Sequence, residues 1–336
     1  MHRKFKLMRI SVTTLLLLYF LSATEICGQN TTEEFKPNGK PASLIFTNFN
    51  TSFSDGETTP AFEITRAYLG YEYNFSKEWF GRLTLDFGDP KVGSMQYTAF
   101  LKFAFIQYKN DKFKGLFGMI PTTQFKYSED IWGLRYIEKS YMDAYDFYSS
   151  ADIGFTIDYA FTKNVSADLS VFNGEGYKSL QRDEYLRPAI GVTVKELKNF
   201  TARIYADYMG KEVKQTTMAA LAGYSGKKLV VIAEYNYEWN TKMVDDNDMY
   251  GTSIYVTFKP GDKIKYFARF DDLKSKIPEG ESDPWQLASD GGLLMGGFEF
   301  GLIKGIKIAP NVRYWNPADK SMPATTYAYL NIELRY

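Results

Sequence analysis

The segment from Phe200 to Tyr208 reads FTARIYADY, and its side chains alternate between apolar and polar along almost its whole length. Successive side chains of a β-strand point to opposite faces of the sheet. The segment therefore predicts a strand with one apolar face and one polar face. The apolar face would carry Phe200, Ala202, Ile204, Ala206 and Tyr208, and the polar face Thr201, Arg203 and Asp207.

The same alternation continues from about Ala42 to Tyr336, and no stretch of the mature chain is typical of a helix. Segments of roughly ten residues, separated by turns or polar loops, predict an all-β fold, namely a closed transmembrane antiparallel β-barrel of about sixteen strands. The count becomes about fourteen or eighteen if one segment is split or merged. The expected strands are 42–53, 61–75, 78–88, 97–109, 112–120, 153–161, 164–173, 188–196, 199–209, 216–224, 228–239, 249–259, 263–272, 292–301, 305–315 and 325–336.

The links between these strands alternate between short and long, which is typical of a bacterial outer-membrane barrel with tight periplasmic turns and longer external loops. The terminal Tyr336 lies on the apolar phase of its strand, as in proteins that the outer-membrane assembly machinery recognises. We therefore expect a location in the bacterial outer membrane, in contact with its lipid. The long links are expected at 54–60, 89–96, 121–152, 174–187, 210–215, 240–248, 273–291 and 316–324.

Residues 1–28 have the pattern of a cleaved secretory signal, with four basic residues followed by an apolar run too short to span a bilayer. We expect cleavage after Gly28. A short N-terminal segment, 29–41, and the barrel, 42–336, would follow. An alternative is that Cys27 is a lipidated cysteine, although the residues before it are bulkier and more polar than such a site normally offers.

Loss of the signal removes much of the chemistry that enzymes use. The only histidine, His2, and the only cysteine, Cys27, both lie in it. The mature chain therefore cannot form a Ser-His-Asp triad, a thiol nucleophile or a zinc site with His or Cys ligands. We expect no enzyme activity, no cofactor and no metal site. The mature net charge is about −3, and nothing suggests a nucleic-acid partner.

The longest link, 121–152, exceeds the length at which loops are usually either functional or disordered. It carries many large apolar groups, among them Phe125, Trp132 and Tyr141, which would not be left in water. A barrel of about sixteen strands encloses a water-filled lumen. We therefore expect this third long loop to fold inward and narrow the lumen. The alternative is an external cap or a loop that contacts other subunits of a trimer.

Several stretches of the chain carry a family resemblance. They are TRAYLGYEY at 65–73, Trp79, the strand at 83–86, residues 118–125, EKS at 138–140, ADIG at 151–154 and VFNG at 171–174. These stretches resemble the phosphate-selective porin O/P family. The resemblance covers most of the mature chain in architecture, but only these stretches in motif. It implies a sixteen-stranded homotrimeric diffusion channel whose third loop folds into the pore.

The charges do not support a preference for phosphate. The loop has three basic and six acidic residues, and the inward phase of the strands carries both signs. Rings of charged side chains set pore selectivity, but opposite charges on neighbouring strands can also simply pair, each exposed pair contributing about 0–1 kcal/mol. The candidate pore-lining or constriction residues are Arg66, Arg82, Lys102, Arg203, Arg269, Arg313, Lys126, Glu129, Asp130, Arg135, Glu138 and Lys139.

These observations predict an outer-membrane porin, through which small hydrophilic solutes or ions diffuse passively, with its width set by loop 121–152. Two other functions stay open at this point. One is a non-conducting barrel with a structural or adhesive role, and the other is a barrel enzyme that uses a carboxylate pair or an acid-dependent serine.

Overall fold

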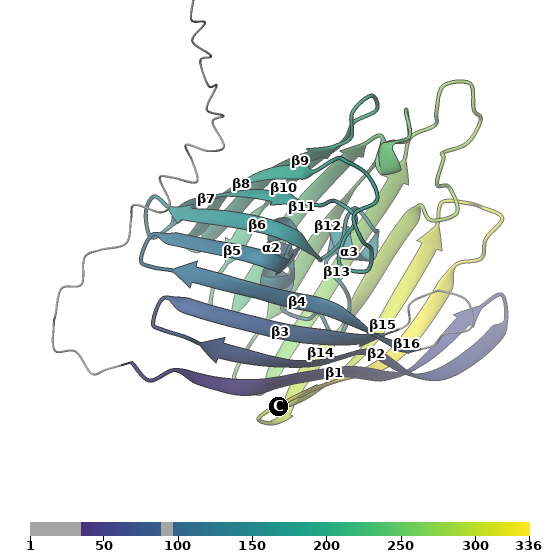
Figure 1. Cartoon of the computed structure of the whole chain (residues 1–336). Helices are drawn as coiled ribbons and strands as arrows, with labels where there is room; N and C mark the ends of the chain where they lie inside the picture. The colour runs from purple at the N-terminus through teal and green to yellow at the C-terminus, as the bar shows by residue number, and fades with distance from the viewer. Residues whose placement is uncertain (1–34, 89–96) are drawn as a thin grey trace, which may run out of the picture. The chain divides into compact units, whose positions relative to one another are not determined.

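The computed structural model describes residues 35–88 and 97–336, so the expected signal and its cleavage site lie outside the described residues, as does the link 89–96. The barrel is closed, because each strand pairs antiparallel with its neighbours and β1 pairs with β16 (Figure 1). Its strands are β1 (Asn38–Ser54), β2 (Glu57–Asn74), β3 (Trp79–Gly88), β4 (Thr98–Lys109), β5 (Phe113–Pro121), β6 (Ala151–Ala160), β7 (Val165–Phe172), β8 (Arg187–Leu197), β9 (Phe200–Met209), β10 (Gln215–Ser225), β11 (Leu229–Trp239), β12 (Met249–Phe258), β13 (Ile264–Ser275), β14 (Gly291–Ile303), β15 (Ile306–Pro317) and β16 (Thr325–Arg335).

The strand prediction is confirmed, since each of the sixteen expected segments contains one strand with bounds shifted by a few residues at most. The faces are confirmed too. On β9, Ile204 is 62% exposed on the outer face, whereas Arg203 is 3% exposed on the inner face. Apolar side chains therefore cover the outside of the barrel, and polar side chains face its inside. This is the arrangement that a barrel in lipid requires.

The prediction of a long link at 54–60 is wrong. Strand β1 continues to Ser54 and β2 begins at Glu57, so only Asp55 and Gly56 separate them. Both residues have positive φ values, 50° and 79°. Asp-Gly is the preferred pair for a two-residue hairpin turn of this kind. The hairpin thus replaces a loop, while the later links keep the expected alternation of short and long.

The expectation that the mature chain contains no helix is also wrong. Loop 121–152 contains α2 (Thr123–Trp132) and the single turn α3 (Tyr141–Ala144), and Thr241–Met243 form a 3₁₀ turn. Helix α2 ends at Gly133, whose left-handed φ of 64° lets its N–H bond to the Glu129 carbonyl. No helix within the described residues is long and apolar enough to cross a membrane.

The loop folds inward, as expected, and Figure 1 shows α2 and α3 within the ring of strands. Its apolar side chains form a core with inward-facing side chains of the barrel wall. The loop contributes Phe125, Trp132, Leu134, Tyr136, Ile137, Tyr141, Met142 and Phe147. The wall contributes Phe46, Ala189, Tyr205, Ala219, Leu221, Ile232, Met249, Tyr255, Phe267, Leu273, Met295 and Ala309. Most of these wall residues lie on β8 to β15, so the loop packs against one side of the lumen.

A charge placed on the outer face tests whether that face meets lipid. We expect Ile204→Arg to lower the free energy of unfolding by ~2–4 kcal/mol, the cost of an arginine near the bilayer midplane. The measurement is reversible denaturant unfolding in phospholipid vesicles. Lys198→Arg, at the short turn between β8 and β9, is the control and should have no effect. An unchanged stability of Ile204→Arg would contradict a lipid-facing surface.

Candidate functional site

Hydrogen bonds from loop 121–152 to acidic residues of the wall hold the loop inside the barrel. The Tyr136 hydroxyl donates to Glu299 on β14 at 2.9 Å, and the Tyr145 hydroxyl donates to Asp271 on β13 at 3.1 Å. On α2, Ser128 Oγ donates to Glu234 on β11 at 3.1 Å. Because these acceptors lie on three different strands, the loop is fixed along a broad strip of the wall.

Basic residues of the wall hold the same loop through aromatic rings. The guanidinium carbon of Arg187 lies 3.9 Å from the centre of the Tyr148 ring, and that of Arg269 lies 5.6 Å from the Trp132 ring. Arg313 binds the Glu138 carboxylate at 2.5 Å. A cation above an aromatic face is attracted by the ring quadrupole, more strongly once water is removed. These wall cations therefore position the loop.

A cavity of about 950 Å³ lies beside the infolded loop. Its lining comes from the loop, from the strands β1 to β3, β8 to β10, β15 and β16, and from the connections 173–186 and 240–248 that follow β7 and β11. Asn48, Thr65 and Asn331 contribute polar surface from the wall, and Tyr148, Tyr177 and Tyr329 contribute rings. The cavity is thus a part of the lumen that the loop does not fill.

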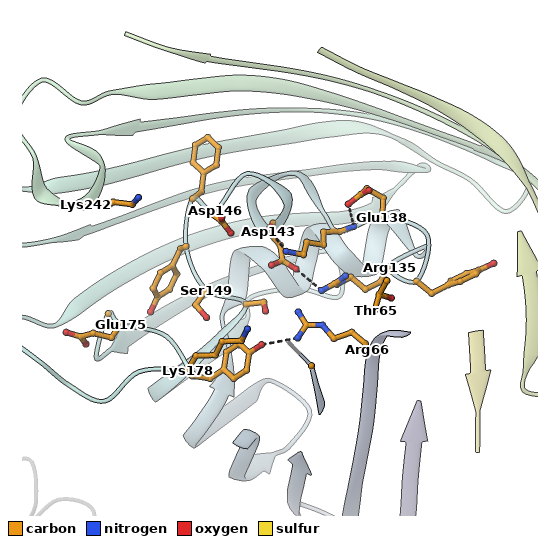
Figure 2. Close-up of a pocket in the computed structure, with 18 of the residues that line it drawn as sticks. Thr65, Arg66, Arg135, Glu138, Asp143, Asp146, Ser149, Glu175, Lys178 and Lys242 are labelled. Carbon is orange, nitrogen blue, oxygen red and sulfur yellow. Dashed lines mark hydrogen bonds and ion pairs between the residues drawn. The ribbon is translucent and has the colours of Figure 1, made fainter. Parts of the chain in front are cut away.

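Charged side chains of both signs meet in this cavity, as Figure 2 shows for Arg66, Arg135, Asp143, Glu175, Lys178 and Lys242. The described lining has eight basic and six acidic residues. The basic ones are Arg66, Arg135, Lys139, Lys178, Arg182, Arg187, Lys242 and Arg313. The acidic ones are Glu63, Glu138, Asp143, Asp146, Glu175 and Asp183. The acidic excess of loop 121–152 is therefore not carried into the cavity, because wall strands and other connections supply cations.

Five of the twelve candidate residues line the cavity: Arg66, Arg135, Glu138, Lys139 and Arg313. Most of their charges are paired. Arg66 bonds with Asp86 on β3, and Arg135 bonds with Glu129 at 3.1 Å and with Asp143 at 3.0 Å. Paired charges still present their exposed atoms to a solute, but the field of each is reduced by its partner.

Other candidates are buried away from this cavity. Arg203 bonds with Asp168 at 2.6 Å and with the Gln124 side chain of α2 at 2.8 Å. Arg269 bonds with Asp271 and with the Lys139 carbonyl. Lys102 donates to Ser150 at 2.6 Å. These three side chains bind groups of loop 121–152 and do not line the described cavity.

The remaining candidates lie elsewhere. Arg82 binds Thr84 at 3.0 Å and Glu72 at 3.8 Å, in the half of β3 nearest the short turn that precedes it. Lys126 and Asp130 pair with one another on an exposed face of α2, and Glu129 binds Arg135. None of these four side chains is part of the described cavity lining.

Sequence reasoning missed Arg187 and Tyr177, both of which line the cavity. Arg187 shares the inward phase of Ala189 and Thr193, so extending the expected strand back by one residue would have found it. It binds Asp207 at 2.8 Å. Tyr177 lies in a connection without any alternation, and no sequence signal places its side chain in the lumen.

No group of three or more His, Cys, Asp or Glu side chains within residues 35–88 and 97–336 is arranged to hold a metal ion. The acidic cluster at 245–248 is instead engaged by the chain itself. Asp246 pairs with Lys276, and Asp248 accepts a hydrogen bond from the Tyr237 hydroxyl at 3.0 Å.

No family model matches this chain, and no curated protein matches it. Solved structures do. OprB of Pseudomonas putida, in a high-pH structure, has a TM-score of 0.68 at 10% identity over 89% of this chain and 94% of its own. The anion-selective porin of Comamonas acidovorans has a TM-score of 0.65 at 8% identity over 90% and 100%. The outer membrane channel DcaP of Acinetobacter baumannii has a TM-score of 0.62 at 12% identity over 89% and 97%.

These similarities show the fold. The chain is a porin-type transmembrane barrel of the kind found in bacterial outer membranes. The narrower resemblance to the phosphate-selective porin O/P family stays a prediction.

The ion pair between Arg135 and Asp143 predicts how the loop responds to acid. Burial by itself would raise the pKa of the Asp143 carboxyl, but the charges of Arg135, Lys139 and Lys102 outweigh it and hold that pKa below its usual 3.8. Because the pKa is lower in the folded state, ionised Asp143 stabilises the docked loop at neutral pH, and this contribution is lost as the pH falls through the lowered value.

We therefore expect the hydrogen-exchange protection of residues 133–147, corrected for intrinsic exchange, to stay constant from neutral pH to the usual carboxyl range and to fall only below it. Asp143→Asn should show reduced protection already at neutral pH, because Arg135 loses one of its two charged partners. An acid-dependent step of equal size in both proteins would contradict this role of Asp143.

Proposed function

We propose that the protein is an outer-membrane porin through which small hydrophilic solutes and ions diffuse passively. The observation that carries this proposal is the charged, polar cavity of about 950 Å³ inside a closed transmembrane barrel, beside an infolded loop. A barrel whose loop served only as an outer cap would leave the lumen unobstructed, whereas here the loop packs deeply against the wall.

The charges of the cavity suggest how solutes pass. Both signs are present, and four of the five lining arginines are paired with carboxylates. This pairing weakens their field, so a hydrated solute of either sign can enter. The surplus of basic groups in the described lining, eight against six, favours anions slightly. A strong preference for phosphate is not part of the proposal, because most of the arginines are occupied by carboxylates or by the loop.

The surroundings and assembly form part of the same proposal. The apolar outer face supports a position in outer-membrane lipid, and the assembly machinery would read the C-terminal strand with Tyr336. The homotrimer follows from the family resemblance. Catalysis is not proposed, because the mature chain would have no imidazole and no thiol.

The test is planar-bilayer conductance of the refolded mature protein, with the reversal potential measured under a KCl gradient. We expect stable open channels with a small preference for chloride. Membrane-inserted, heat-modifiable protein that passes no current would instead support a structural or adhesive barrel.

Loop 121–152 should set the width of this channel. We expect deletion of residues 126–147 to raise single-channel conductance by roughly twofold or more, because conductance follows the open cross-section of the narrowest part. Deletion of residues 279–283, in the external connection between β13 and β14, is the control and should leave conductance unchanged. A folded 126–147 deletion with unaltered conductance would contradict the constriction role.

A further inference from the structure

The connection between β7 and β8 contributes a second element to the lumen, residues 173–178, called here the Tyr177 segment. Its backbone is fastened to the base of loop 121–152. The Gly174 N–H donates to Asp152 Oδ2 at 2.7 Å, and the Tyr177 N–H donates to the Ala151 carbonyl at 3.0 Å. Because Asp152 also accepts from the Tyr148 hydroxyl, one carboxylate joins the segment to the loop.

The Tyr177 side chain contacts charged residues of three wall strands. Its hydroxyl accepts a hydrogen bond from Arg66 Nη1 on β2 at 3.1 Å and donates one to Asp86 Oδ2 on β3 at 3.0 Å. Lys102 Nζ on β4 lies 3.8 Å from the centre of its ring. Figure 2 shows Arg66 on the wall of the cavity that this segment borders.

These contacts determine which wall charges a solute can reach. The Asp86 side chain is 0% exposed and that of Arg66 is 14% exposed, while Lys102 as a residue is 4% exposed. Tyr177 lies against all three, yet only Arg66 lines the cavity. The ring therefore covers one ammonium and helps to cover one carboxylate, and the hydroxyl holds the guanidinium that remains in view.

Two glycines give the segment the shape that brings Tyr177 to the wall. Gly174 and Gly176 have φ values of 115° and 78°, which side chains with a Cβ rarely adopt. A Cβ on Gly176 would also overlap the Ser149 side chain, and one on Gly174 would overlap Met209. The sequence Asn173-Gly174-Glu175-Gly176-Tyr177 thus fits a backbone that must pass very close to the loop base at Ser149 and to Met209 on β9.

We propose that Tyr177 is a positioning residue that determines the charge selectivity and, together with loop 121–152, the width of the lumen. It closes the space between the loop base and strands β2 to β4, shields Lys102 and Asp86, and holds Arg66 toward the cavity. The selectivity part rests on the proposed channel function. The shielding of Lys102 does not, and can be tested without any current.

The first experiment compares the conductance and reversal potential of wild type, Tyr177→Phe and Tyr177→Ala. Tyr177→Ala should raise conductance about 1.5- to 2-fold and raise the chloride-to-potassium permeability ratio about twofold, because the Lys102 ammonium becomes accessible and Arg66 loses its bond to Tyr177, while Asp86 stays paired with Arg66. Tyr177→Phe keeps the ring, so its conductance should match wild type while its permeability ratio moves part of the way. Tyr185→Ala, in the same connection but outside the described cavity lining, is the control and should match wild type.

Gly176→Ala tests the same inference without altering Tyr177. The added Cβ displaces the segment, so this variant should reproduce the conductance and selectivity of Tyr177→Ala. A merely structural effect would lower thermal stability in both variants but would not move their reversal potentials in the same direction.

The second experiment measures acylation of Lys102 in detergent by a sulphonated N-hydroxysuccinimide ester, read by peptide mass spectrometry. Wild type and Tyr177→Phe should be protected, and Tyr177→Ala and Gly176→Ala should react at least about tenfold faster, since the ammonium loses its ring cover. Equal labelling of Lys102 in all four proteins would overturn the shielding. The labelling of Lys102 could change while the wild type conducts and has the same reversal potential as its variants. That result would overturn the selectivity role. If the wild type passes no current, the proposed channel function is contradicted, and the labelling still tests the shielding of Lys102.

Discussion

The structure depends on one constraint, the closure of its backbone hydrogen-bond ladder. In lipid no water is available to satisfy an unpaired N–H or C=O, so a sheet can span the membrane only if its two edges pair with each other. Residues 44–54 of β1 and 325–335 of β16 form that seam in eleven consecutive pairs. Once the sheet closes, period-two alternation leaves only one arrangement, with apolar side chains toward lipid and polar ones inside.

The polar inside of the barrel then has to accommodate an apolar loop. It does so because one part of the wall carries apolar side chains on its inner face. The inward residues of β8 to β15 include Leu221, Ile232, Tyr255 and Phe267, which pack with the loop as the interior of a soluble protein would. Charged residues among them do not stay free, because Arg203 and Arg269 bond to both a wall carboxylate and the loop. The solvent-filled part of the lumen is what remains beside this core.

The strands could be predicted because alternation is a local signal that repeats over the whole chain. The infolding of loop 121–152 could be predicted as well, since its content of large apolar groups favours burial over exposure to water, although an external cap or a trimer contact stayed open. Helix α2 was missed because its buried stripe, Phe125, Ser128 and Trp132, is short and contains a serine. The contacts of Tyr177 were missed for a different reason: Arg66 and Asp86 lie about a hundred residues away along the chain, and no local pattern reports such a distance.

The seam between β1 and β16 also implies an order of events during folding. It joins nearly the two ends of the barrel sequence, so it carries the largest loop-closure entropy of any strand pair and is expected to form last. Until then the sheet is an open, curved ribbon whose concave side exposes Leu221, Ile232 and Phe267. Loop 121–152 precedes these strands in the chain and can cover each as it joins the ribbon. Packing of the loop on these wall side chains would then reduce the apolar surface that a half-formed barrel exposes to water.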